Sequence, residues 1–300
     1  MLKPAYSTET EKSEHPPDHP NRRMDLRFLV HLAGTGATDI HPLGRAATTA
    51  LLEGLRLEPG LRVLDVGCGT GGTMVRLARY RPAHVDGVDV TPAMLRVARK
   101  RIRLSGLGGR CTLQLIEPGG RLLFDDASFD RVYTESVLGF QDAEGAKALL
   151  GEIYRVLKPG GIFAANEAIW RTGVPAGTIA AVNATCLADF GLRMASDSPW
   201  ALDEWLGVMK SAGFQVLSAD LIGATSAGRT TSRSVLGLRT LASAALTRFY
   251  WLRSHVLPSG RQARALYRRL NRQHRQDGTY IEPRLFVLLK SDASTAEFPV

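Results

Sequence analysis

The chain has 300 residues, enough for one large α/β domain with an insertion or for two small domains. Apolar residues make up 44% of it, which is typical of a globular chain that buries a full core. No stretch reaches the roughly 18 uninterrupted apolar residues of a membrane span. Three scattered cysteines exclude a disulfide framework, and none lies in a metal-binding CxxC or Cys/His cluster: Cys68, Cys111 and Cys186. We therefore expect no metal site and a reducing, cytoplasmic location.

The net charge is +9, and the excess of basic residues lies late in the chain. Between Arg248 and Arg275 there are eight arginines and no acidic residue. Such a surface can attract nucleic acid, anionic lipid or an acidic substrate. A solvated helix face is the commoner reason for such a run, and we favour it. Residues 1–27 contain prolines and mixed charge but no signal-peptide apolar stretch, so we expect a flexible tail.

From residue 61 to 168, short β-branched runs alternate with helical stretches, a pattern typical of βαβ units and a parallel sheet. The strands expected here are Arg62–Val66, Val85–Val90, Cys111–Ile116, Phe129–Thr134 and Ile162–Asn166. The expected helices are Thr73–Tyr80, Pro92–Leu104 with Thr91 as its N-cap, and Ala143–Leu157. Lys158–Gly161 supplies the breaker and turn residues that end the last helix.

After Trp170 the pattern loosens. A helix is expected at Ala201–Ala212, and strands at Phe214–Ala219 and Leu285–Lys290, with a mostly helical insertion between these strands. In the insertion, apolar residues recur at helical spacing: Val235, Leu238, Ala242, Ala245, Phe249 and Leu252. We favour packing of this stripe against the domain. A lid over a lipophilic substrate and a membrane-surface helix are the alternatives.

A glycine loop, Gly67-x-Gly69-x-Gly71, follows the first strand and precedes a helix. Glycines let the backbone approach a ligand closely, and the helix start offers free N–H groups. Nicotinamide enzymes use a similar loop for a pyrophosphate. However, Asp65 would repel a pyrophosphate and could pair with an ammonium group, while Asp89 ends the next strand and could accept ribose hydroxyls. A cofactor that pairs with one acid near its tail and with another at its ribose, and that has no phosphate between these groups, is S-adenosylmethionine (SAM). The two acids therefore favour SAM.

Four ordered motifs cover about residues 60–168: Val63–Gly72, Gly87–Leu95, Leu122–Val132 and Arg155–Gly161. Together they resemble the class I SAM-dependent methyltransferases. The resemblance is nearest to the branch with quinone, sterol and tocopherol C-methyltransferases and natural-product enzymes. It implies that the following residues bind the cofactor: Asp65, Gly67, Cys68, Gly69, Thr70, Gly71, Asp89, Val90, Met94, Glu117, Pro118, Gly119 and Glu135.

Within that resemblance, Asp65 and the loop backbone would hold the methionine part and Asp89 the ribose. Val90 and Met94 would flank the adenine. After the third strand, where the family usually has a Gly-Asp-Ala-like triplet, this chain has Glu117–Gly119. Either Glu117 or a backbone group would then bind the adenine amine.

Methyl transfer from a sulfonium mainly requires positioning and exclusion of water, but an acidic acceptor proton needs a base. The catalytic candidates are Glu135, Glu167 and His31, with His41 a further histidine near the loop. Glu167 ends the fifth strand at the ligand-binding edge of the sheet, and could be a base, hold a substrate amine, or pair with an arginine. For Trp170 we favour core packing over stacking on a substrate.

We predict an α/β fold, a doubly wound, Rossmann-like, mostly parallel sheet with an antiparallel C-terminal strand and a helical insertion. The expected parts are a flexible tail (1–27), an N-terminal helical lid (28–60), a SAM-binding core (61–168) and a substrate-specificity region (169–300) containing the insertion (about 223–280).

The predicted activity is SAM-dependent methyl transfer to C, O or N of a small molecule, in natural-product, lipid or quinone-type metabolism. Alternatives are an RNA methyltransferase using Arg248–Arg275, a SAM-fold enzyme or partner subunit that does not methylate, and a dehydrogenase. Nucleic acid is disfavoured because the sequence contains no recognisable RNA-binding module. Thr134–Val137 also stands where amine and base methylases carry an Asn/Asp-Pro-Pro-aromatic motif. We expect a monomer or homodimer, and peripheral membrane contact remains open.

Overall fold

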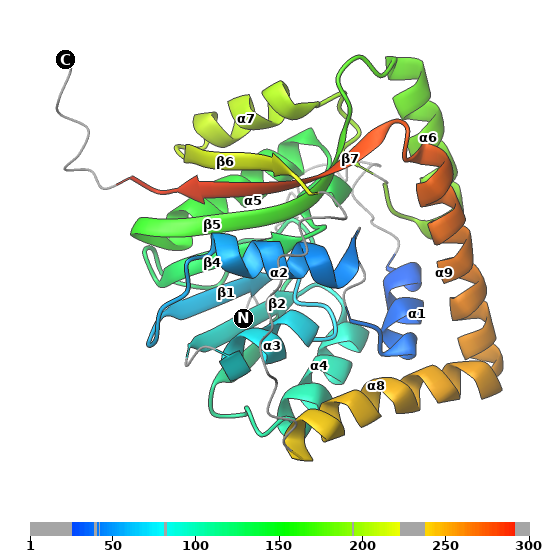
Figure 1. The fold of residues 1–300 in the computed structure, drawn as a ribbon. Helices are drawn as coiled ribbons and strands as arrows, with labels where there is room; N and C mark the ends of the chain where they lie inside the picture. The colour runs from blue at the N-terminus through cyan, green and yellow to red at the C-terminus, as the bar shows by residue number, and fades with distance from the viewer. Residues whose placement is uncertain are drawn as a thin grey trace, which may run out of the picture.

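The structure, a computed structural model, describes residues 26–38, 41, 43–80, 83–193, 195–222 and 238–291. Within these residues, seven strands form one sheet in the order β3-β2-β1-β4-β5-β7-β6 (Figure 1). The strands are β1 Arg62–Val66, β2 His84–Asp89, β3 Cys111–Leu115, β4 Phe129–Glu135, β5 Leu157–Trp170, β6 Gln215–Leu221 and β7 Ile281–Leu289. Residues 1–25 of the expected tail, and Val235 of the apolar stripe, lie outside the described residues.

Strands β1 to β5 are parallel, whereas β7 runs antiparallel to both of its neighbours, β5 and β6. The predicted antiparallel C-terminal strand is therefore confirmed, and it lies inside the sheet. The strand order changes direction between β1 and β4. Ligands bind beyond the carboxyl ends of the strands at such a point, because the connecting loops diverge there.

The helices cover both faces and one end of this sheet. They are α1 Arg27–Thr35, α2 Gly44–Gly54, α3 Gly72–Tyr80, α4 Pro92–Leu104, the 3-10 turn η1 Leu138–Phe140, α5 Ala143–Val156, α6 Ala176–Phe190, α7 Leu202–Ser211, α8 Leu238–Val256 and α9 Pro258–Asp277. The predicted helical insertion is α8 and α9, which join β6 to β7 and run along the outside of the molecule (Figure 1).

Side-chain alternation along the strands separates two cores. In β1, Val63 packs with helices α2, α3 and α4 on one face, and its neighbour Leu64 packs with α5 and α7 on the other. This is the two-residue period of a strand buried on both faces. A third apolar cluster joins α1, α4, α6 and α8 through residues such as Phe28, Val182 and Tyr250. The third cluster holds the helices that stand beyond the carboxyl end of the sheet.

Three sequence expectations differ from the structure. We expected Lys158–Gly161 to separate a helix from a strand, but β5 already begins at Leu157 and accommodates these residues by a register shift against β4. Helix α6 was not foreseen. The apolar stripe does not pack on the domain as a whole: Phe249 is 59% and Leu252 58% exposed, because α8 buries Tyr250 on another face instead.

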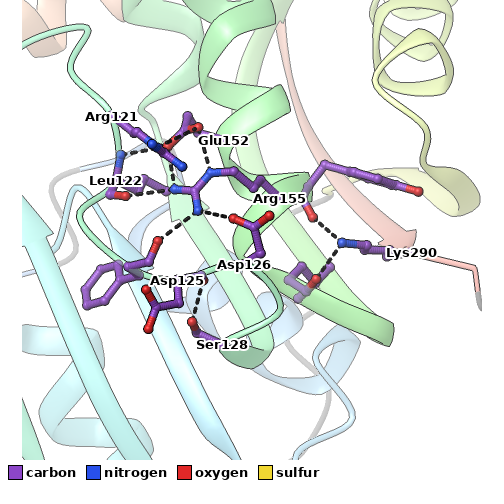
Figure 2. A network of polar contacts seen from close by, with 11 residues as sticks. Arg121, Leu122, Asp125, Asp126, Ser128, Glu152, Arg155 and Lys290 are labelled. Carbon is purple, nitrogen blue, oxygen red and sulfur yellow. Dashed lines mark hydrogen bonds and ion pairs between the residues drawn. The ribbon is translucent and has the colours of Figure 1, made fainter.

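The loop between β3 and β4 is fastened to α5 by one guanidinium. Arg155 donates to the carbonyl oxygens of Leu122 and Phe124, both at 2.8 Å, and to Asp126 at 2.7 Å (Figure 2). Glu152, which pairs with Arg155 at 2.8 Å, accepts from the Leu122 N–H. These contacts hold the loop that follows β3. The first residues of this loop border the cavity described next.

Candidate functional site

A cavity of about 500 Å³ lies at the carboxyl ends of β1, β2 and β4. Its wall on the sheet side contains the glycine loop and the ends of these strands. Its opposite wall comes from α1, η1, α5 and α6. The cavity is therefore located at the change of strand direction, where the open α/β fold binds ligands.

The glycine loop uses backbone conformations that side chains disfavour. Gly67, Gly69 and Gly71 have φ angles of +80°, +51° and +74°. A Cβ on Gly67 would lie 2.4 Å from Cγ2 of Val137, whereas one on Gly71 would meet Ala98 of α4 at 3.1 Å. Gly67, Gly69, Cys68 and Thr70 line the cavity, but Gly71 does not. Gly71 thus serves helix packing, and the other two glycines shape the cavity wall.

Asp65, at the end of β1, is buried against the cavity and accepts a hydrogen bond from the Tyr133 hydroxyl at 2.7 Å. Burial raises the pKa of its carboxyl well above the usual range, against the hydrogen bond from Tyr133. The charges of Glu135 and Asp89 raise it further. A cationic ligand would relieve this concentration of negative charge, and a phosphate would worsen it.

Asp89, at the end of β2, is tied to the loop it faces. Its two oxygens accept the N–H groups of Gly69 and Thr91, each at 2.8 Å. Burial raises its pKa, and these two donors act in the opposite direction. The carboxylate lines the cavity, so its remaining lone pairs can accept hydroxyl groups.

The segment after β3 forms a tight turn at the cavity mouth. The Gly120 N–H donates to the Glu117 carbonyl at 2.9 Å, with Pro118 second and Gly119 third at φ +70°. This is a type II turn, which favours proline and glycine at those two positions. All four residues line the cavity, as do Val90 and Met94.

Glu135, at the end of β4, is fully engaged by three side chains. It accepts from Thr73 at 2.6 Å and from Thr48 at 2.7 Å, and pairs with His41 Nε2 at 2.8 Å. Asn166 donates to the other nitrogen of His41 at 3.1 Å. Burial would raise the pKa of Glu135, but His41 and the two threonines outweigh it, so the pKa lies below the usual range. Glu135 is a charged anchor that joins α2 and α3 to the sheet, not an unoccupied base.

Glu167, on β5, accepts from backbone groups. Its Oε1 accepts the N–H groups of Val137 and Leu138 at 3.0 and 3.1 Å, and its Oε2 accepts that of Gly139 at 3.1 Å. Burial raises its pKa, and these donors oppose that rise. The partners of Glu167 are therefore Thr134 and the backbone of residues 137–139, and not an arginine, which was one of the alternatives from the sequence. The arrangement makes Glu167 the support of the loop that contacts Gly67.

Two other candidates lie away from the reacting space. His31 is absent from the cavity lining; it borders a separate pocket between α1 and α9, and its Nδ1 contacts the Arg27 carbonyl. Trp170 is 1% exposed and donates to the Ser196 carbonyl at 2.8 Å, which agrees with the core-packing interpretation.

A buried arginine that the sequence did not single out connects the loop to distant helices. Arg101 of α4 donates to the carbonyls of Thr70 at 2.9 Å and Gly36 at 2.8 Å, and to the Thr247 hydroxyl of α8 at 2.9 Å. The sequence does not distinguish Arg101 from the exposed arginines around it, because the residues that bury it come from distant parts of the chain. Tyr133 was missed for a similar reason, since it reads as an ordinary strand aromatic.

The wall opposite the loop is mainly apolar, with Gln141, Glu152 and Arg193 as polar members of the lining. Its apolar side chains come from three helices, η1 and the segment after α6: Phe28, Leu29, Leu32, Phe140, Leu149, Cys186, Phe190 and Leu192. Phe28 and Phe190 contact each other with ring centroids 5.2 Å apart. One cavity thus combines a polar wall, which includes the carboxylates of Asp65, Asp89 and Glu135, with a wall made mainly of hydrocarbon.

Known methyltransferases are similar to this chain in sequence. Residues 63–161 match a family model described as a methyltransferase domain. The uncharacterized methyltransferase YodH of Bacillus subtilis is 33% identical over 193 residues, which cover 64% of this chain and 76% of that protein. The 24-methylenesterol C-methyltransferase 2 of Oryza sativa is 34% identical over 172 residues, covering 54% of this chain and 44% of that protein.

Among solved structures, a SAM-dependent methyltransferase from Geobacter sulfurreducens bound to S-adenosylhomocysteine has the same fold. The TM-score is 0.61 at 21% identity, and the alignment covers 89% of this chain and 99% of that one.

Proposed function

Because the chain belongs to the class I SAM-dependent methyltransferases, we propose that it transfers the methyl group of SAM to a lipophilic small molecule. The observation that carries the proposal is the division of the cavity into a polar wall and an apolar wall. Acceptors of sterol, quinone or natural-product type fit such a wall, because its side chains offer area for burial and few groups to bond.

In this proposal the polar wall binds the cofactor. Asp65 accepts the ammonium of its methionine part, and Asp89 accepts ribose hydroxyls with the lone pairs that Gly69 and Thr91 leave free. Val90 and Met94 border the adenine, with the Glu117–Gly120 turn on its edge. When bound, SAM supplies an electrophilic methyl group on a sulfonium. The three acids at the strand ends favour such a cation over a phosphate-bearing dinucleotide.

The apolar wall positions the acceptor and excludes water. Helices α1 and α6 contribute most of it, through residues such as Leu29, Leu32 and Phe190. Positioning of reactants and removal of water are the main contributions that a protein makes to an in-line displacement. No residue of α8 or α9 appears among the described residues that line the cavity. The described part of the arginine run therefore does not line the cavity, which argues against the RNA methylation alternative.

The carboxylates near the reacting space are occupied. Glu135 is engaged by His41 and two threonines, and Glu167 by three backbone N–H groups. We infer that both position the site and that neither removes the acceptor proton. This favours an acceptor that needs little help from a base, such as an electron-rich carbon or an already acidic hydroxyl.

The test is transfer of label from methyl-tritiated SAM to defined acceptors. We expect label in the organic phase with a sterol alkene, a polyprenyl quinol or a macrolide as acceptor, and none with phosphoethanolamine or sarcosine. Selective labelling of the polar acceptors would refute the substrate class. Calorimetric titration with SAM and with NAD runs in parallel, and binding of NAD without SAM would refute the cofactor assignment.

A further inference from the structure

Helix α8 presents an apolar stripe to solvent on the side turned away from the cavity. Phe249, Leu252 and Val256 are 59%, 58% and 70% exposed. They lie within about 60° of one another around a helix that turns about 100° per residue. Leu246 and Tyr250 lie about 60° and 100° from Phe249 around the helix, beyond Arg253, and form the inward face, which packs with α1. The exposed stripe is therefore a second apolar face of the helix.

Two exposed arginines flank the stripe. Arg248 lies about 40° beyond Leu252 around the helix, and Arg253 about 40° beyond Phe249 on the other side. Leu238–Asp277, which spans α8 and α9, contains nine arginines, and its single acidic residue is Asp277. On α9, Arg261, Arg268 and Arg272 are exposed and recur at helical spacing. The stripe thus lies on a helix that carries a positive charge at each edge of the stripe and contains no acidic residue.

We propose that the outer face of α8 docks on the surface of an anionic phospholipid bilayer. Phe249, Leu252 and Val256 enter the boundary between headgroups and acyl chains, and the helix lies in the plane of the surface. Arg248 and Arg253 place their charges among the phosphates while their stems cover the edges of the stripe. This is how interfacial amphipathic helices bind, with apolar area and basic charge both contributing.

The same features disfavour two other occupants. RNA phosphates would pair with the arginines, but a phosphodiester backbone offers no apolar surface to Leu252 and Val256. A second copy docked about a twofold axis would bring Arg248 and Arg253 of both copies together, with no acidic residue nearby in α8 to compensate. A bilayer surface matches both the stripe and its charges.

The experiment is vesicle co-sedimentation of the full chain. Vesicles of phosphatidylcholine alone are compared with vesicles that also contain phosphatidylglycerol. We expect binding to the anionic vesicles, weakened by added salt. Phe249→Ser with Leu252→Ser should reduce the partition coefficient about tenfold or more, because two large apolar side chains no longer leave water. Arg248→Gln and Arg253→Gln should each reduce it about fivefold.

Matched control variants make the same kinds of substitution at exposed positions outside α8. Leu123→Ser with Leu221→Ser alters two leucines that are 65% and 53% exposed. Lys147→Gln with Lys210→Gln removes two positive charges from α5 and α7. Both double variants should bind vesicles like the parent chain. The four α8 substitutions should leave SAM affinity unchanged, since none of these residues lines the cavity.

Three outcomes would overturn the proposal. One is equal sedimentation with neutral and anionic vesicles. Another is a loss of vesicle binding on addition of RNA, with the arginine variants affected and the Phe249/Leu252 variant unaffected. The third is a dimer in analytical ultracentrifugation that Phe249→Ser with Leu252→Ser dissociates, because the stripe would then be covered by a second copy.

Discussion

The two walls of the cavity are built by different means. On the polar wall, backbone groups set the geometry: glycines at positive φ, N–H groups bonded to Asp89, and the turn after β3. On the apolar wall, side chains of α1 and α6 set it, and the contacts are interchangeable hydrocarbon surface. A backbone geometry tolerates little change, whereas an apolar surface can be reshaped one residue at a time. One wall is thus suited to a constant ligand, and the other to a variable one.

Glu167, which supports the loop between the two walls, gives the largest expected effect. Glu167→Ala should lower the free energy of unfolding by about 3–5 kcal/mol, because three N–H groups, two of them buried, lose their acceptor. Urea denaturation measures it, with the exposed Glu144→Ala as control. An effect no larger than that of the control would show that water replaces the carboxylate and that the walls do not share this support.

Gly67 tests the backbone character of the polar wall. Gly67→Ala should cost about 1–3 kcal/mol from the positive φ alone, and more from the approach to Val137. Adding Val137→Ala should recover only the second part. Full recovery of stability and SAM affinity in the double variant would mean that the φ angle of Gly67 imposes no constraint.

The acids of the polar wall come next. Asp65→Ala and Asp89→Ala should each weaken SAM binding by about 1–3 kcal/mol, the loss of a charged hydrogen bond. Isothermal titration calorimetry gives the affinities, and Tyr133→Phe serves as comparison because it keeps the Asp65 carboxylate. Unchanged affinity in both alanine variants would refute the assigned cofactor pocket.

Substitutions in the apolar wall should change the KM of the acceptor and not the affinity for SAM. Leu29→Ala and Leu149→Ala each remove a half-buried side chain from the lining. Each should raise the KM of a lipophilic acceptor by about tenfold or less, the range for a few methylene groups, and leave the Kd of SAM as it is. A parallel change in SAM affinity would show that the walls are not separate.

The smallest effect concerns acid stability. The pKa of Glu135 is lowered in the folded chain, so its charge stabilises the fold at pH values above its unfolded pKa, about 4.3. That contribution is lost as the pH falls through the folded pKa. The stability difference between the parent chain and Glu135→Gln should therefore shrink below about pH 4. Urea midpoints measured from pH 7 to pH 3 would show it, and a constant difference would contradict the shift.

The part of the molecule that the sequence predicted well is the part built from short-range signals. β1 and α4 have the predicted bounds, because alternation, the Thr91–Pro92 start and the glycine loop act within a few residues. The cavity lining includes all the expected cofactor residues except Gly71. The roles of Glu135 and Glu167 were not predictable, because their partners come from elements up to 94 positions away in the chain, as with His41. Likewise, the helical spacing of the apolar residues could not determine which of the two apolar faces of α8 is buried.

Arg101 has a consequence for how the outer helices can vary. One guanidinium holds Thr70 of the glycine loop, Gly36 after α1 and Thr247 of α8, and Tyr250 fills the space above Gly36, where a Cβ would lie 2.5 Å away. In a saturation mutagenesis scan of α8, the tolerance of each position to substitution should therefore depend on its angle around the helix axis. Positions 249, 252 and 256 should accept many residues without loss of SAM binding. At 247 and 250, substitutions should disturb the cofactor loop from the far side of the domain.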